Sequence, residues 1–274
     1  MINKMSFVGA GSMAESIMSG ILNKQVVRPD QIYVTNKEDR ERLEHIKTIY
    51  DVKISSDKKG VMEDADIIIL AMKPKDVTDA INSIREYVSE NQLVVSVLAG
   101  ISTSYVEQEL NQDVAVIRAM PNTSASIGFS ATAIAAGKFA KSNQMNMVRQ
   151  LFETIGTTTV VDEDDLHVVT GLSGSGPAYI YYLVEAMEAA AKESGLKEEI
   201  SKELIVQTLV GAAEMLKNTQ ASPEELRQKI TSPGGTTQAG LETLERYKYQ
   251  EALMECIKNA KERSIELGKP YQRV

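Results

Sequence analysis

The sequence predicts two regions of different fold class, an α/β region with a parallel sheet and then an all-helical region. Short apolar runs alternate with longer amphipathic stretches from Met5 to about Val161, which is typical of parallel strands joined by helices. Strand signals stop after Asp162, and stretches rich in alanine, leucine and glutamate follow. We therefore expect an α/β domain at residues 1–162 and a helical domain at residues 163–274.

The strands of the first region are predicted from short runs of apolar residues with little alternation. Such runs are typical of strands that are buried on both faces of a parallel sheet. The expected strands are residues 5–8, 32–35, 67–71, 94–97, 115–119 and 158–161, with 130–137 as a further strand-like segment. The expected helices between them are residues 14–24, 37–50, 74–88, 102–110 and 144–155.

The helical region is divided by residues that end helices. The breaks are predicted at Gly195-Leu196, at Ala221-Ser222-Pro223 and at Ser232-Pro233-Gly234-Gly235. The acidic run at residues 162–165 is either a linker or a helix start, and we favour the helix start because carboxylates stabilise helix N-termini. Apolar side chains surround nearly the whole helix expected at 177–191. This pattern motivates the hypothesis that the helical domain forms a core between two subunits.

The composition restricts the class of protein. Of the 274 residues, 43% are hydrophobic and 25% are charged, as in ordinary globular proteins. A net charge of −8, without a basic stripe, argues against nucleic-acid binding. The apolar run at 67–72 is far shorter than the roughly 20 residues that span a bilayer, so no membrane insertion is expected. A single cysteine, Cys256, excludes an intrachain disulfide and a multi-cysteine metal site. No signal peptide is recognised at the start, so we expect a cytoplasmic location. We also expect no metal site.

A glycine motif follows the first expected strand and opens the first expected helix. The motif is Gly9-Ala10-Gly11-Ser12-Met13-Ala14, which has the Gly-x-Gly-x-x-Ala spacing of a Rossmann-type dinucleotide site. Gly9 permits a tight turn, Gly11 permits close approach of a pyrophosphate, and Ala14 keeps the helix near the sheet. The alternative is a glycine-rich turn that binds nothing. The surrounding α/β pattern favours binding.

The end of the second expected strand favours NADPH over NADH. A carboxylate here binds the 2′-hydroxyl of NAD, whereas a 2′-phosphate requires donors and positive charge. Asn36, Lys37 and Arg40 supply donors and charge, and no acidic residue occupies the ribose position. Three acidic neighbours weaken this preference, because the two cations are then also consistent with a solvated helix surface. NADH remains the less favoured cofactor.

Small or polar residues end three later strands, where an open α/β sheet receives its ligand. They lie in Ala71-Met72-Lys73-Pro74, in Leu98-Ala99-Gly100 and at Asn122. The alternative for Lys73-Pro74 is an ordinary turn with a surface lysine. The predicted cofactor-binding residues are therefore Gly9, Gly11, Ser12, Met13, Asn36, Lys37, Ala71, Lys73, Pro74, Ala99, Gly100 and Asn122.

Four motifs resemble those of the pyrroline-5-carboxylate reductase family, and the resemblance spans the whole chain. They are Phe7-Val8-Gly9-Ala10-Gly11-Ser12-Met13-Ala14, Arg118-Ala119-Met120-Pro121-Asn122-Thr123, Gly171-Leu172-Ser173-Gly174-Ser175-Gly176-Pro177-Ala178-Tyr179 and Thr231-Ser232-Pro233-Gly234-Gly235-Thr236-Thr237. The first motif is shared by many dehydrogenases. The third and fourth are similar to this family and to few others.

The resemblance implies an enzyme that reduces the C=N bond of 1-pyrroline-5-carboxylate to L-proline with NADPH. It also implies a homodimer, or a ring of dimers, whose helical domain serves dimerisation and substrate binding. The substrate loop would hold the carboxylate of the cyclic imine through Ser232, Gly234, Gly235, Thr236 and Thr237. Glycines allow such N–H groups to converge on an anion. The alternative for this loop is a helix C-cap and an interhelical turn.

Catalysis is assigned to Thr237, which we expect to orient the ring nitrogen and to assist its protonation. His45 and His167 are expected to be structural or surface residues. The β-hydroxyacid dehydrogenases are a rival class, but Ile180 and Val184 stand where that class has a lysine and an asparagine. A related protein with weak catalysis and a regulatory or interaction role is the non-enzymatic alternative.

Overall fold

The computed structural model describes residues 2–271, which divide into two compact units. The sheet unit contains the chain up to Pro177 and the C-terminal residues from Lys258 onwards. The helical unit is Ala178–Ile257. Each unit is described by itself below.

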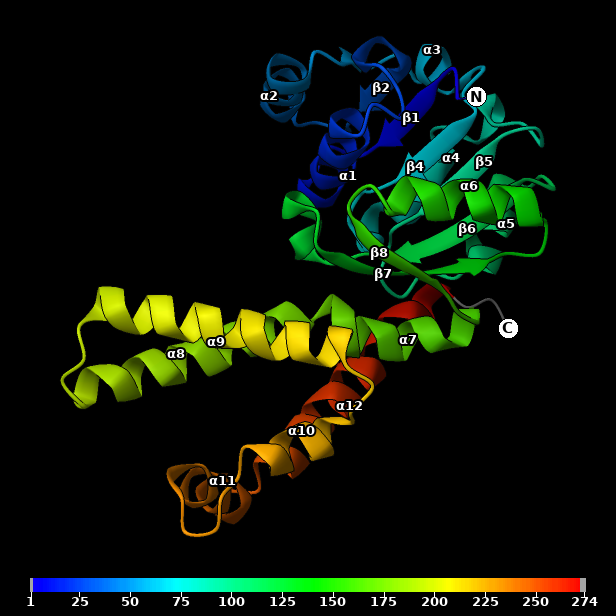
Figure 1. Ribbon diagram of the computed structural model, residues 1–274. Helices are drawn as coiled ribbons and strands as arrows, with labels where there is room; N and C mark the ends of the chain where they lie inside the picture. Colours follow the sequence, from blue (N-terminus) through cyan, green and yellow to red (C-terminus); the bar gives the residue numbers. More distant parts are fainter. Residues whose placement is uncertain (1, 272–274) are drawn as a thin grey trace. The chain divides into compact units, whose positions relative to one another are not determined.

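The sheet unit is built on one sheet of eight strands in the order β3-β2-β1-β4-β5-β6-β7-β8 (Figure 1). Every neighbouring pair is parallel except β6 and β7, which are antiparallel. The strands are β1 (Met5–Val8), β2 (Ile32–Thr35), β3 (Lys53–Ile54), β4 (Ile67–Leu70), β5 (Leu93–Ser96), β6 (Ala115–Met120), β7 (Ser130–Ala136) and β8 (Gly156–Val160). The first six strands have the order of the doubly wound nucleotide-binding fold. Its strand order reverses between β1 and β4, where a crevice forms.

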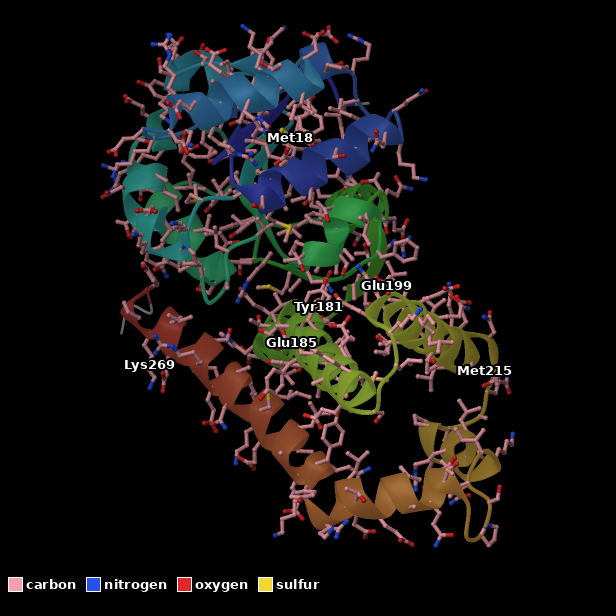
Figure 2. The ribbon with its side chains drawn as sticks, turned by 90° about the vertical axis from the view of Figure 1, so that its left-hand side faces the viewer. Met18, Tyr181, Glu185, Glu199, Met215 and Lys269 are labelled. Carbon is pink, nitrogen blue, oxygen red and sulfur yellow. The ribbon has the colours of Figure 1, made fainter. Side chains whose placement is uncertain are left out.

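Helices cover both faces of the sheet. One face packs against α1 (Ser12–Asn23), α2 (Arg40–Tyr50) and α6 (Ser142–Phe152). The other packs against α3 (Lys58–Met62), α4 (Val77–Asn82) and α5 (Thr103–Leu110). Met18 of α1 is fully buried in the first of these layers (Figure 2). Because both faces are covered, β1, β4, β5 and β6 are buried along their whole length, which explains their continuous apolar sequences.

Side chains at the helix ends explain several observed boundaries. The Asp39 carboxylate accepts a hydrogen bond from the Arg42 N–H at 2.9 Å, so α2 begins at Arg40 rather than at the predicted residue 37. The Ser102 hydroxyl accepts from the Tyr105 N–H at 3.2 Å and thereby caps α5. Short 3-10 turns also lie at η1 (Pro29–Gln31) and η4 (Thr123–Ile127).

The predicted continuous helix at 74–88 was wrong. The segment forms η2 (Pro74–Asp76), α4 and η3 (Arg85–Tyr87) instead. The Ser83 hydroxyl donates to the Ala80 carbonyl at 2.7 Å, and such a side-chain bond competes with the helical hydrogen bonds of the backbone. The strand β3 and the helix α3 were not predicted, because two and five residues are too short to show a period.

After β8 the chain is helical, as predicted. The acidic run contains the 3-10 turn η5 (Glu163–Asp165) and leads directly into α7 (Leu166–Val169), which confirms the helix start. A π-helical segment, η6 (Thr170–Gly174), follows. The remaining helices are α8 (Gly176–Glu193), α9 (Glu198–Asn218), α10 (Pro223–Lys229), α11 (Thr236–Arg246), α12 (Tyr249–Gly268) and the 3-10 turn η7 (Lys269–Tyr271).

The helices of the helical unit bury little within one chain. Within one chain α8 has no buried residue, so the helical unit alone does not cover the apolar side chains predicted around the helix at 177–191. Ile180, Tyr181 and Tyr182 are 46%, 60% and 76% exposed. Figure 2 labels Tyr181 and Glu185 on α8, which lie one helical turn apart. Within residues 2–271, no helix is both long and apolar enough to span a membrane.

Candidate functional site

The candidate nucleotide site begins where three parallel strands end side by side. The register pairs Val8 with Thr35 on one side and with Leu70 on the other. The next residues are therefore also neighbours, and the Gly9 N–H donates to the Thr35 carbonyl at 2.9 Å. The Ala71 N–H donates to the Val8 carbonyl at 2.9 Å. These bonds hold the ends of β1, β2 and β4 at one rim of the sheet.

Gly9 is the position in this rim that requires glycine. Its φ is +109°, which L side chains rarely adopt. A Cβ there would stand 2.5 Å from the Ala71 carbonyl oxygen. The absence of a side chain therefore lets the loop after β1 pass directly against the loop after β4.

The N-terminus of α1 faces this rim with unsatisfied donors. Gly11 is the N-cap residue in an extended conformation, and no side chain caps the helix there. The N–H groups of the first turn of an α-helix have no acceptor within the helix. These N–H groups and the helix dipole favour a bound anion such as a pyrophosphate.

Arg42 fixes the loop from outside, a role that sequence reasoning missed. Its Nε donates to the Ala10 carbonyl at 2.7 Å, and its guanidinium forms an ion pair with Glu15 of α1. The Tyr50 hydroxyl donates to Glu15 at 3.2 Å. Burial, followed by the charge of Glu15, raises the pKa of Tyr50. The contact between Arg42 and Ala10 spans 32 residues of sequence, so no spacing rule reveals it.

A cavity of about 910 Å³ lies at this rim, within the sheet unit. It brings together eight of the predicted cofactor-binding residues, namely Gly9, Gly11, Ser12, Met13, Asn36, Lys37, Ala71 and Lys73. It is also lined by Arg42 and Lys58, which were not predicted. The four remaining predicted residues, Pro74, Ala99, Gly100 and Asn122, are not part of its lining.

Those four residues have other surroundings in the chain. Pro74 opens η2 directly after Lys73. Ala99 packs against a small apolar cluster that includes Met120 and Leu166. Gly100 is buried, and a Cβ on it would stand 3.1 Å from the Gly268 nitrogen of α12.

Asn122 is 7% exposed and is engaged on three sides. Its side-chain amide donates to the Ser173 carbonyl at 3.0 Å, and its side-chain oxygen accepts from the Ser124 N–H at 3.1 Å. Its backbone N–H donates to the Ser130 hydroxyl at 3.1 Å. Asn122 therefore ties the end of β6 to the π-helical segment η6. Single π-helical turns occur often at functional sites.

The charges at the β2 end of the cavity differ in how they are paired. Lys37 forms an exposed ion pair with Asp79 at 3.4 Å. Asp39 is engaged as the cap of α2. The Lys58 ammonium is half-buried and donates to the Thr35 hydroxyl at 2.9 Å. The donors and positive charge here suit a phosphate on the ribose, and the N-terminus of α1 suits the pyrophosphate. The residues thus fit a dinucleotide that carries a 2′-phosphate.

A partly buried ion pair anchors the start of the helical segment to the sheet. Glu163 accepts from the Thr103 N–H at 2.7 Å and from the Thr103 hydroxyl at 2.6 Å. It also lies 3.4 Å from the Arg118 guanidinium, which is 1% exposed. Burial lowers the pKa of Arg118, and the charge of Glu163 opposes that shift. The contact joins α5, β6 and η5.

The two histidines lie where a structural or surface role is expected. His45 is exposed on α2. His167 of α7 is half-buried, and its Nδ1 lies 3.0 Å from the Ser264 hydroxyl of α12. Burial, followed by the charge of Arg118, lowers the pKa of His167. Within the described part of the chain, no group of three or more His, Cys, Asp or Glu side chains is placed to hold a metal ion.

The predicted substrate loop connects α10 and α11 in the helical unit. Gly234 has a φ of +71°, and its N–H donates to the Gln238 side chain at 2.8 Å. The Gly235 N–H donates to the Ser232 carbonyl at 3.0 Å. Gly235 is the N-cap of α11, and no side chain caps that helix. The donors left without an intrahelical acceptor are the N–H groups of the first turn, which begins at Thr236 and Thr237.

Comparison with known proteins identifies the relatives of the chain. A protein-family model described as pyrroline-5-carboxylate reductase dimerisation matches residues 163–267. A second family model, described as NADP oxidoreductase coenzyme F420-dependent, matches residues 4–100. Pyrroline-5-carboxylate reductase 2 of Bacillus subtilis is 46% identical over 270 residues, which cover 98% of this chain and 97% of the relative. The chain belongs to the pyrroline-5-carboxylate reductase family.

Solved structures of pyrroline-5-carboxylate reductases have the same fold over the whole chain. The enzyme of Coxiella burnetii superposes with a TM-score of 0.88 at 33% identity and covers 97% of this chain and 99% of its own. The Plasmodium falciparum pyrroline carboxylate reductase, solved with NADP bound, has a TM-score of 0.88 at 27% identity and covers 97% and 98%. The region 163–267 is thus a pyrroline-5-carboxylate reductase dimerisation domain, and its exposed apolar helices are surfaces suited to self-association.

Proposed function

We propose that this protein reduces the C=N bond of 1-pyrroline-5-carboxylate to give L-proline, with NADPH as the reductant. The observation that carries the proposal is similarity to pyrroline-5-carboxylate reductases over 98% of the chain. A Rossmann-type cradle alone is shared by many dehydrogenases. Similarity that includes the helical region and the loop at 231–237 distinguishes this reaction from alcohol oxidation.

When bound, NADPH would supply a hydride to the imine carbon. The chain contributes a cradle for the pyrophosphate at Gly9, Gly11, Ser12 and Met13, and donors for the 2′-phosphate at Asn36 and Lys37. Ala71 and Lys73 line the same cavity. In the proposal, the nicotinamide lies beside the ends of the later strands, which are formed by Pro74, Ala99, Gly100 and Asn122.

The substrate loop holds the carboxylate of the cyclic imine in this proposal. The open N–H groups at the N-terminus of α11 and the hydroxyls of Ser232, Thr236 and Thr237 are suited to a carboxylate. Gly234 and Gly235 allow the turn that precedes the helix. Reduction leaves negative charge on nitrogen unless a proton is present. Thr237 therefore orients the ring nitrogen and assists its protonation.

The assembly is part of the proposal where it goes beyond self-association. We infer a homodimer as the basic unit, with a ring of dimers as the larger form. The exposed apolar residues of α8 support the dimer. A cytoplasmic location and the absence of a nucleic-acid partner remain predictions of the sequence.

The reaction is tested by mixing the purified protein with NADPH and 1-pyrroline-5-carboxylate and following the loss of reduced nicotinamide together with the formation of proline. We expect rapid turnover with NADPH and slower turnover with NADH. A six-membered cyclic imine acid measures how strictly the ring size is selected. Binding of NADPH without turnover would contradict the proposal and favour a regulatory or interaction role.

A further inference from the structure

Lys58 differs from the other cations that line the nucleotide cavity. Lys37 is exposed and paired with Asp79, and Arg42 is paired with Glu15. Lys73 and Lys75 are exposed. Lys58 is half-buried, and among the described residues it makes no ion pair. Its positive charge is therefore the one in this lining that is both shielded from water and uncompensated by a carboxylate.

The position of Lys58 is fixed by the local fold. It is the first residue of α3, which follows the short edge strand β3 beside β2. Its ammonium donates to the hydroxyl of Thr35, the last residue of β2, at 2.9 Å. Thr35 is fully buried, so this contact holds the lysine side chain against the end of β2. The end of that strand is where a Rossmann-type fold binds the adenine ribose.

The chemistry of an ammonium in this position favours a dianionic group. A lysine ammonium has three donors, and the hydroxyl of Thr35 occupies one of them. Lys58 is half-buried, and this burial lowers its pKa because the charged ammonium is partly removed from water. An anion bound beside the ammonium would compensate for the hydration that the ammonium has lost. Screening by salt is also weaker there than at the exposed Lys37.

We propose that Lys58 is the specificity-determining residue that selects the 2′-phosphate of NADPH over the 2′-hydroxyl of NADH. The inference rests on the proposed function in one respect, namely that the cavity binds a nicotinamide dinucleotide. It shifts the main determinant of cofactor choice from Asn36 and Lys37, which the sequence predicts, to a residue 23 positions beyond Thr35.

The test measures ligand binding, so that it does not depend on turnover. Adenosine 2′,5′-bisphosphate and 5′-AMP differ only in the 2′-phosphate, and their dissociation constants are measured by calorimetry for the full chain and for Lys58→Met. We expect the variant to bind the bisphosphate about ten- to a hundredfold more weakly, the range of one charge-assisted hydrogen bond. Binding of 5′-AMP should be unchanged. The Lys58→Arg variant, which retains the charge, should restore most of the preference.

A matched control removes one positive charge elsewhere. Lys59→Met alters the next residue, which is exposed and paired with Glu63 at 3.5 Å. We expect this change to weaken bisphosphate binding by less than about threefold, as for an exposed charge. Lys37→Met removes an exposed cation that is itself a proposed donor to the 2′-phosphate, and we expect it to weaken bisphosphate binding less than Lys58→Met does.

The outcomes separate this inference from the proposed function. If Lys58→Met keeps the wild-type preference, or loses both ligands equally, Lys58 does not select the 2′-phosphate. If the wild-type chain shows no preference for the bisphosphate, both the NADPH preference and the role of Lys58 are overturned. If the preference is present and depends on Lys58 while the imine is not reduced, the inference stands and the reaction is wrong.

Discussion

The sheet unit and the helical unit differ in how far they bury their apolar side chains within one chain. In the sheet unit, four strands are buried along their entire length between two layers of helices. In the helical unit, Ser201 and Ile205 are the two buried positions among residues 178–257. The sheet unit therefore completes its own core, whereas the helical unit leaves apolar faces that a second chain can cover.

Because of this difference, one predicted binding region depends on the fold of a single chain and the other on the presence of a second chain. The nucleotide cavity is lined by residues of one unit of one chain, so its shape follows from the fold of the sheet unit. The substrate loop belongs to the unit whose apolar residues are uncovered in the single chain. We therefore expect nucleotide binding to be less sensitive to dissociation of the assembly than catalysis is.

The largest effect is expected from a charge in the apolar face of α8. Ile180→Glu places a carboxylate in a surface that we expect to be buried between subunits, and an uncompensated buried charge costs about 3–5 kcal/mol. The dimer dissociation constant should rise about a hundredfold or more. Light scattering over a range of concentrations measures it. Ser194→Glu adds the same charge at an exposed residue directly after α8 and should leave the dimer intact. An unchanged dimer in the Ile180→Glu variant would contradict the inference that a second chain covers the apolar face of α8.

The next largest effect is expected at the substrate loop. Thr237→Ala removes the hydroxyl proposed to orient the ring nitrogen, and the turnover number should fall about a hundredfold. The dissociation constant for NADPH should stay within about twofold, because the cavity is lined by other residues. Steady-state kinetics and nucleotide titration give the two values. Thr243→Ala, on the exposed side of the same helix, is the control. Unchanged turnover would remove Thr237 from the mechanism.

A smaller effect is expected from the contact that holds the glycine loop. Arg42→Met removes the hydrogen bond to the Ala10 carbonyl and leaves Glu15 without its cation. We expect the dissociation constant for NADPH to rise about tenfold, which corresponds to about 1.4 kcal/mol. The turnover number at saturating NADPH should change less than about twofold. Lys47→Met, exposed further along α2, should alter neither value. A fall in turnover without a change in affinity would show that the loop contact acts on chemistry instead.

The smallest effect concerns the pH dependence of stability. The folded-state pKa of His167 lies below its unfolded value of about 6.5, chiefly because of burial and then because of Arg118. The unfolded chain then binds more protons, so this contribution is complete above pH about 6.5 and is lost as the pH falls toward the folded-state pKa. In the His167→Gln variant, the unfolding temperature should fall less over that pH range than in the wild type, with a difference of at most about 2–4 °C.

The other histidine provides the matched control for this measurement. His45 is exposed, and His45→Gln should keep the wild-type dependence of the unfolding temperature on pH. Asp164, Glu163 and Lys261 also act on His167, and they are retained in both variants. Identical pH profiles for the two variants would show that His167 does not contribute in the folded sheet unit.

The strands and the glycine rim could be predicted because their signals are local. Strand β2 was predicted at its observed bounds, and Gly9, Asn36 and Ala71 were identified as neighbours because parallel strands end at one edge. Lys58 and Arg42 could not be identified in this way. Their contacts with Thr35 and Ala10 join segments 23 and 32 residues apart, and they depend on helix positions that no periodic pattern encodes.

The helical region showed a different limit of prediction. The three predicted breaks are observed, because glycine, proline and capping residues act within a few positions, whereas the break between Arg246 and Tyr249 was not predicted. The apolar character of α8 was predicted from its sequence, and its side chains are uncovered in the single chain, which is consistent with the hypothesis of a core between two subunits. Composition records whether a surface is apolar, and it does not record which chain covers that surface.

The sheet unit receives its last part from the end of the chain. Residues from Lys258 onwards belong to it, and a Cβ on Gly100 would stand 3.1 Å from the nitrogen of Gly268. During synthesis on the ribosome, this edge of the sheet unit must wait until about 80 residues of the helical unit have emerged. A nascent chain stalled before Lys258 would therefore expose an incomplete sheet unit.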